Sequence, residues 1–247
     1  MAHLLRRFPM PKLVTKVTTP PSPISYDSQG TCTTNLPTTA STSASWSHTA
    51  GTSSSGSTAI IVYILGFYGG SVPGTISSAT VTYGGKTLTQ IGSSLIGGSS
   101  NTGTLYAYGA NGVTPGTGTV SASLTFTQTM SVVAFDSVTY LNSNGFNSAA
   151  TNTGASRSNS FFLTCGPVTS APNKMVSNCT VGYFYSGGTF NGFSGYSGTQ
   201  RYGNFDSNGM LFFIGDAPGA SSVSFTLTAP FSGAVNGLWS DIAIPIT

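Results

Sequence analysis

The chain has 247 residues, of which only 5% are charged, and its formal net charge is +3. Four of its eight basic residues lie within the first sixteen positions, so the rest of the chain carries four Lys and Arg against five Asp, a balance of −1. Glu is absent and the other strong helix formers are scarce, whereas Gly, Ser, Thr and aromatic residues abound. This composition excludes a helical protein and indicates β-strands joined by turns.

Residues 1–24 are expected to form an extended N-terminal anchoring arm. Five of the thirteen prolines lie there, and proline disfavours helix. The sequence KLVTKV alternates, which suits a strand that adds to a partner's sheet edge. A solvated tail and a weak nucleic-acid-binding patch are the alternatives. Docking onto a partner accounts best for the apolar side chains. The expected partner-binding residues are Leu4, Leu5, Arg6, Arg7, Phe8, Met10, Lys12, Leu13 and Lys16.

The segment 25–42 is rich in Ser and Thr and is interpreted as a linker. Residues 43–247 are interpreted as one β-sandwich domain. Its first strand is SASWSHTA, residues 43–50, in which alternation turns the ring of Trp46 inward.

The next segment, AIIVYILGFY at residues 59–68, is continuously apolar and predicts a fully buried central strand. A hairpin is expected over residues 77–93, with its turn at Gly84 and Gly85. Residues 143–159 are polar and are interpreted as a connection. Further strands are expected at residues 103–110, 115–127, 130–141, 158–166, 175–185, 209–217, 221–229 and 237–246.

No segment offers a helical period, which excludes parallel β/α folds because crossover helices are missing. Short strands at regular spacing predict an all-β, antiparallel β-sandwich of jelly-roll-like type. Whether the sheets form one sandwich or two stacked ones is left open by the sequence.

The three cysteines do not make a disulfide framework. Cys165 and Cys179 either pair or stay free and buried, and we prefer free thiols. No C-x-x-C motif is present, so we expect no metal. The N-terminus lacks the apolar core of a secretion signal, and the longest apolar run is too short to cross a bilayer. The sequence therefore predicts a cytoplasmically made protein without membrane insertion.

The one histidine outside the arm is His48, so a catalytic triad in the rest of the chain would have to use it. No G-x-S-x-G motif surrounds a serine, and the five Asp residues are scattered. We therefore interpret His48 as a strand residue with a structural hydrogen bond, and DSNG at residues 206–209 as a plain turn. We expect no catalytic residues and no cofactor.

One stretch, residues 183–205, interleaves eight aromatic residues with Gly and Ser. Such residues can stack on sugar rings or pack on a partner, and they can also seal their own domain. The possible ligand-binding residues are Phe190, Phe193, Tyr196, Arg201 and Tyr202.

The order of these segments resembles a β-sandwich module of tail-associated proteins of bacteriophages that infect actinobacteria. The resemblance rests on Ser47-His48-Thr49, on the hairpin Val81-Thr82-Tyr83-Gly84-Gly85 with Leu88-Thr89, on Tyr106, and on Pro115 with Gly118-Thr119-Val120. It covers residues 43–140 and, more loosely, residues 158–246. This chain departs from the pattern in having Tyr106 in place of a Trp, and a single proline before the Gly-Thr pair.

The resemblance implies a non-enzymatic virion structural protein, assembled in the host cytoplasm. We expect a minor tail or tail-tip component, anchored by its arm to other virion proteins and to copies of itself, and touching a host cell-surface glycan. A capsid decoration protein and a stand-alone carbohydrate-binding module or adhesin are the alternatives. No nucleic-acid partner is expected.

Overall fold

The computed structural model describes residues 22–30, 33–35, 37, 39–69, 74–97, 103–185 and 187–247. The expected arm residues from Leu4 to Lys16 lie outside these ranges. The described residues form strands, turns and loops without a helix, and therefore no helix among them is long and apolar enough to cross a membrane. The strands are β1 (Ser25–Gln29), β2 (Thr33–Asn35), β3 (Ser41–Ala50), β4 (Ser57–Phe67), β5 (Ile76–Tyr83), β6 (Lys86–Thr87), β7 (Thr89–Ile96), β8 (Gly103–Asn111), β9 (Gly116–Phe126), β10 (Val132–Ser143), β11 (Ala150–Val168), β12 (Met175–Tyr185), β13 (Thr199–Phe205), β14 (Met210–Pro218) and β15 (Val223–Ile246).

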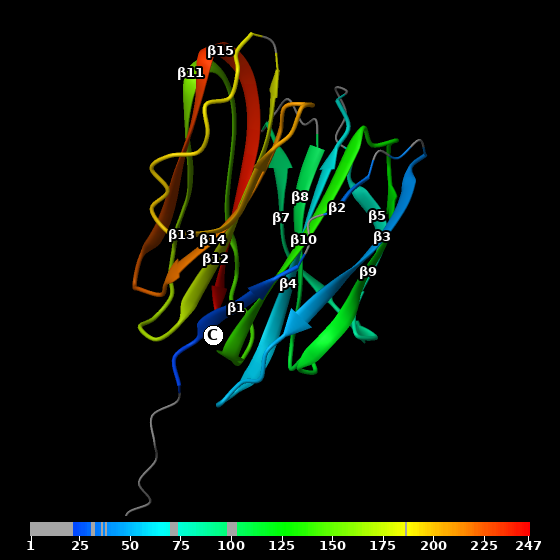
Figure 1. Cartoon of the computed structure of the whole chain (residues 1–247), viewed down its shortest axis with the longest axis vertical. Coiled ribbons are helices and arrows are strands. Elements are labelled where there is room, and N and C mark those ends of the chain that lie inside the picture. The colour runs from blue at the N-terminus through cyan, green and yellow to red at the C-terminus, as the bar shows by residue number, and fades with distance from the viewer. Residues whose placement is uncertain are drawn as a thin grey trace, which may run out of the picture.

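The described strands form three antiparallel sheets that are stacked in layers (Figure 1). The middle sheet has the strand order β1-β10-β4-β8-β7, and β2 also pairs with β10. A sheet of order β3-β9-β5-β6 covers one face of it, and a sheet of order β11-β15-β12-β14-β13 covers the other. The prediction of an all-β antiparallel sandwich is confirmed, and two sandwiches share the middle sheet.

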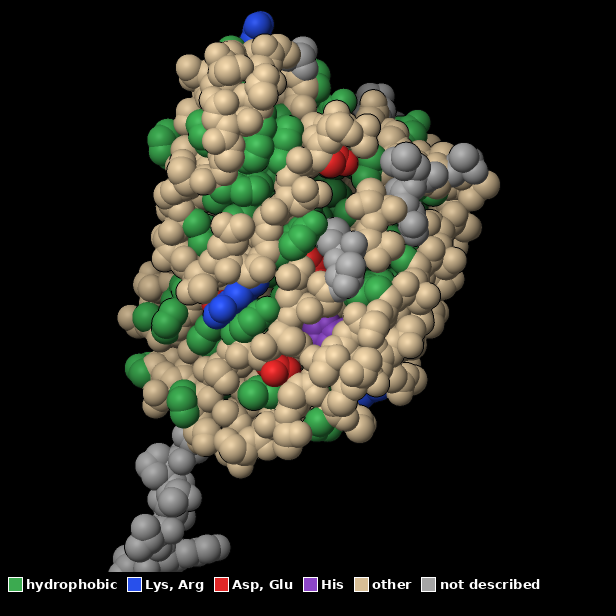
Figure 2. Space-filling view, in the orientation of Figure 1, with side chains coloured by type: hydrophobic (Ala, Val, Ile, Leu, Met, Phe, Trp, Pro, Cys, Tyr) green, Lys and Arg blue, Asp and Glu red, His purple; other side chains and the backbone are tan. Residues whose placement is uncertain are grey.

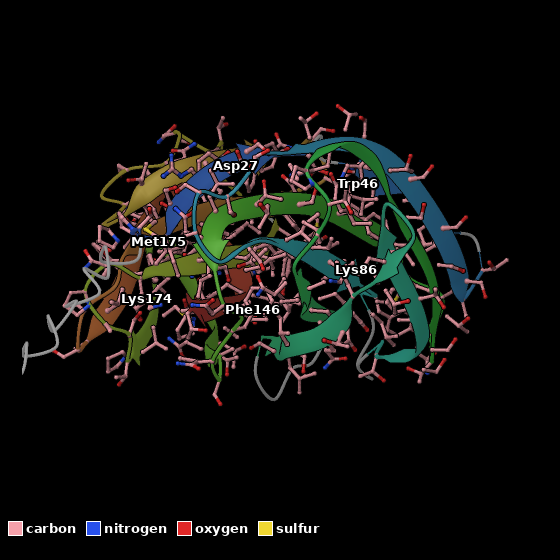
Figure 3. All side chains as sticks on the ribbon, turned by 90° about the horizontal axis from the view of Figure 1, so that it is seen from below. Asp27, Trp46, Lys86, Phe146, Lys174 and Met175 are labelled. Atoms are coloured by element: carbon pink, nitrogen blue, oxygen red, sulfur yellow. The ribbon has the colours of Figure 1, made fainter. Side chains whose placement is uncertain are left out.

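Strand β4 shows why the middle sheet needs continuous apolar sequence. Its alternate residues Tyr63 and Leu65 enter the core shared with the β11–β15 sheet, whereas Val62 and Ile64 enter the core shared with the β3–β9 sheet. Residues 58–67 are all buried. Each large apolar side chain buried in this way contributes roughly 1.5–3 kcal/mol. The predicted central strand is thus confirmed. Trp46 is also buried as predicted, and Figure 3 shows it between β3 and the middle sheet.

The β11–β15 sheet bends over its own outer face. Residues 236–246 of β15 pair with both β11 and β12 at their shared positions, whereas the only strand paired with residues 223–230 among those described is β11, beyond a register shift between Ser158 and Ser160. The bent halves place Phe161 and Leu227 against Phe184 and Phe213 of the flat part of the sheet. This packing makes a further core, and the aromatic stretch closes it through bridges from Phe190 and Ser194 to β15.

The structure corrects several boundaries. Residues 25–29 and 33–35 of the expected linker are strands, because both add to the open edge of β10. Ile24, expected to belong to the arm, is buried in the body, and its N–H donates to the carbonyl of Asn173. The polar connection 143–159 was wrong in its second half, since residues 150–159 open the long strand β11. The expected strands 221–229 and 237–246 are one strand, β15.

The hairpin also differs from the expectation. The turn at Gly84 and Gly85 is correct, and both glycines have positive φ values, 54° and 82°. However, the returning strand β6 pairs with β5 over only two residues, and β7 then crosses to the middle sheet and pairs with β8. A short run of strand-forming residues looks the same in sequence whether it stays in one sheet or crosses to the next, so the sequence does not reveal the crossing. Cys165 and Cys179 are buried thiols that take part in no disulfide, as preferred from the sequence.

Candidate ligand-binding site

Three of the five predicted ligand-binding residues pack their rings on the protein's own outer core. Phe190 stacks on Phe205 with ring centroids 4.4 Å apart. Phe193 and Tyr196 meet Phe213 edge to face at 5.1 and 4.7 Å. All three are partly buried. Most of the surface of these three rings is therefore covered by the protein's own core, in agreement with the possibility that the aromatic stretch seals its own domain.

Arg201 joins two sheets. Its Nε and Nη2 donate to the Oδ2 and Oδ1 atoms of Asp216 at 2.8 and 2.9 Å, and its guanidinium carbon lies 3.8 Å from the ring centre of Tyr26. Asp216 lies in β14, whereas Tyr26 lies in β1 of the middle sheet. Burial raises the pKa of Asp216, although Arg201 opposes this shift. Arg201 is therefore occupied by internal contacts, and Tyr202 also packs inward, 6.3 Å from Phe212.

A hollow of about 560 Å³, here called the outer hollow, opens at one end of the β11–β15 sheet. On the face seen in Figure 2, hydrophobic side chains gather over this sheet. Four phenylalanines and one tyrosine contribute to its lining, together with a polar turn between β13 and β14. Its lining residues are Phe184, Tyr185, Gly188, Thr189, Phe190, Phe205, Asp206, Ser207, Asn208, Gly209, Phe231 and Val235.

The turn at the rim of the outer hollow is held by Asp206. Its Oδ1 accepts hydrogen bonds from the backbone N–H groups of Asn208 and Met210, both at 2.9 Å, and Gly209 has a φ of 80°. This confirms DSNG as a turn. The carboxylate has lone pairs left to accept further hydrogen bonds, because each carboxylate offers about four.

A second hollow of about 330 Å³, here called the inter-sheet hollow, lies between the middle sheet and the β11–β15 sheet. The middle sheet and the loops at its end contribute Phe67, Gly69, Ser131 and Val132 to its lining, and the other sheet contributes Tyr183, Asn208 and Met210. Asn208 lines both hollows. Of the residues predicted from sequence, only Phe190 lines either one. Tyr183 and Tyr185 line the hollows but are expected from the sequence only as strand residues. Their position at the end of β12 is the signal that could have identified them as candidate ligand-binding residues.

His48 belongs to a separate, closed network. Its Nδ1 lies 2.8 Å from Ser137 Oγ, which accepts from Trp46 Nε1 at 2.9 Å. Its Nε2 lies 3.1 Å from Thr139 Oγ1, which in turn donates to Asp27 Oδ2 at 2.9 Å. Because Thr139 donates to the carboxylate, it accepts from Nε2–H, and Nδ1 is left to accept from Ser137. The bonds therefore define the neutral tautomer of His48 with its proton on Nε2.

Burial agrees with this assignment. His48 is 1% exposed, and burial lowers its pKa from 6.5 to about 4, while Asp27 opposes the shift. Gly30 lies over the network, so close that a Cβ there would stand 2.2 Å from Ser137 Oγ. The hydroxyls of Ser137 and Thr139 are fully buried. The interpretation of His48 as a structurally bonded strand residue fits this geometry.

Two further carboxyl groups are buried within the sheets. Asp136 accepts from Gln29 Nε2 at 2.6 Å, and burial raises its pKa to about 7. Asp241 accepts from Thr180 Oγ1, and burial likewise raises its pKa to about 7. Neither lines a described hollow. Within the described ranges no group of three or more His, Cys, Asp or Glu side chains is placed to hold a metal ion.

The fold and the two hollows define a three-layer, all-β protein with an aromatic concave site at one end. Comparisons with protein-family models, with curated proteins and with solved structures found no match.

Proposed function

We propose that this chain is a non-enzymatic structural protein of a bacteriophage virion, a minor tail or tail-tip component. Its N-terminal segment anchors it to other virion proteins, and the end of the sandwich that carries the two hollows contacts the host surface. The order of sequence motifs described above supports the virion assignment. The alternative is a decoration protein on the capsid. It would be anchored by the same N-terminal segment, and would differ only in its position on the particle.

One observation supports the non-enzymatic assignment most directly: the buried ionisable side chains of the described sandwich are used in structural bonds. His48 is locked in a network of hydroxyls, Asp216 is paired with Arg201, and Asp136 accepts from Gln29. An acid or base in catalysis must instead reach a reacting proton in a substrate. The linings of the two hollows contain one carboxylate, that of Asp206, which closes a turn, and no His, Lys or Cys.

The proposal is tested by removing the anchor. The deletion should span residues 1–21, because Ser22 N bonds to Ser55 Oγ and Ile24 is buried in the body. The truncated protein is expected to keep its melting temperature and to be lost from purified particles, as measured by quantitative mass spectrometry. Full incorporation of the truncated protein rejects the anchor. Immunogold labelling of intact particles distinguishes tail from capsid, and the absence of the protein from particles rejects the proposed function.

A further inference from the structure

We propose that the outer hollow and the inter-sheet hollow together bind a neutral carbohydrate chain. This inference rests on the proposed function, since it names the class of ligand for the host-surface contact. The observation that supports it is that Tyr183, Tyr185 and Asn208 connect the two hollows.

Tyr183 and Tyr185 are two residues apart in β12, and their side chains therefore point to the same side of the strand. Their rings are stacked with centroids 5.1 Å apart and planes 20° apart. Tyr185 lines the outer hollow and is 42% exposed, whereas Tyr183 lines the inter-sheet hollow and packs on Phe67 at 4.3 Å. Asn208 lines both. The hollows are thus neighbours around one turn, and a single chain molecule can occupy both.

The linings match the two sides of a sugar ring. A pyranose offers an apolar face of C–H groups and an edge of hydroxyls, and aromatic rings beside a few polar groups are complementary to both. Tyr185 supplies an exposed ring, while Thr189, Ser207 and Asn208 supply hydroxyl and amide groups. Asp206 is oriented by the hydrogen bonds of its turn before any ligand arrives. Both volumes fall in the range of about 300–1,000 Å³ typical of small-molecule sites.

The charge of the linings selects a neutral ligand. Neither hollow contains a Lys or Arg among its lining residues, and the outer hollow contains the carboxylate of Asp206. Phosphate and sulfate groups are held mainly by Arg and Lys. Nucleic acids, teichoic-acid-like polymers and sulfated glycans are therefore disfavoured at this site.

The test uses the full-length protein on an array of neutral and charged glycans. It is followed by calorimetric titration with two soluble series of two to six units, β-1,4-linked glucose and β-1,4-linked N-acetylglucosamine. We expect binding to at least one neutral glycan, with an affinity that rises with chain length and levels off once both hollows are filled. Absence of binding to any neutral glycan, binding to charged glycans alone, or an affinity independent of length beyond two units overturns the inference.

Variants locate the binding. Tyr185→Ala is expected to weaken binding roughly tenfold or more, which corresponds to about 1.4 kcal/mol, and Tyr185→Phe is expected to retain it. The matched control is Phe162→Ala, because Phe162 is 73% exposed on β11 and lines neither hollow. Equal affinity of Tyr185→Ala and wild type, with melting temperatures unchanged, refutes the site. Unchanged glycan binding by Tyr185→Ala, together with normal incorporation of the protein into particles, would refute the carbohydrate site and leave the proposed virion function intact. Absence of the protein from particles would instead refute the proposed virion function, without testing the carbohydrate site.

Discussion

Removing the Arg201 side chain is expected to destabilise the protein far more than removing an exposed arginine. Asp216 is 1% exposed and receives two hydrogen bonds from Arg201, whose own side chain is 23% exposed. In Arg201→Ala this carboxylate keeps only the hydroxyl of Tyr140, at 3.4 Å. Breaking a buried ion pair from one side costs about 3–5 kcal/mol, and the partial exposure of Arg201 favours the lower end, about 3 kcal/mol.

The cost should depend on pH. Without Arg201, burial raises the pKa of Asp216 further above its ordinary value. A group whose pKa is raised on folding stabilises the protein at low pH, and that stability is lost as the pH rises through the folded pKa. The destabilisation should therefore be largest at pH 7.5 and should shrink towards pH 4. Arg201→Ala combined with Asp216→Asn should recover part of the loss, because no buried charge remains.

The assay is urea denaturation followed by fluorescence, which is informative because Trp46 and Trp239 lie in different outer sheets. With m-values of about 1–3 kcal/mol per molar, a loss of about 3 kcal/mol lowers the midpoint by roughly 1 M or more. The control is Arg157→Ala, an exposed arginine on β11, for which a change within about 0.5 kcal/mol is expected. If the two alanine variants lose the same stability, or if the loss at Arg201 does not change with pH, the buried-pair reasoning is wrong.

Three other predictions concern stability. His48→Gln removes a group whose pKa falls from 6.5 to about 4 on folding. As the pH is lowered from 6.5 to 4, the free energy of unfolding of wild type should therefore fall by up to about 3 kcal/mol relative to that of the variant. Parallel curves of unfolding free energy against pH would contradict this. Asp136→Asn should show the opposite pH dependence, because burial raises the pKa of Asp136 to about 7. As the pH rises from 4 to 8, the free energy of unfolding of wild type should fall by up to about 4 kcal/mol relative to that of the variant. A difference between the two proteins that does not change with pH would count against this. Gly30→Ala should cost about 1–3 kcal/mol, since the new Cβ meets Ser137 Oγ and the His48 ring, and an unchanged melting temperature would show that the covering segment can move away.

Local pattern accounts for the strands that were predicted well. β12 runs over residues 175–185 as expected, and β4 was identified as a central strand because both of its faces are apolar. The turn of Gly84 and Gly85 follows from the need for positive φ. The candidate site was predicted only in part, since Phe190 lies at the outer hollow but Arg201 is used inside the protein. A stretch of aromatic residues looks the same in sequence whether its rings face a ligand or the core.

The amino-acid sequence by itself determined that this protein is built of antiparallel strands, because side-chain alternation, glycine turns and the lack of helix formers are local properties. Only the tertiary structure decided which strands share a sheet, that β7 crosses to the middle sheet, and that β15 bends over its own face. It also decided the partners of Arg201, since Tyr26 lies far away along the chain. The physical reason is that period-2 alternation specifies which side of a strand is buried, whereas contacts between distant residues depend on how the layers stack.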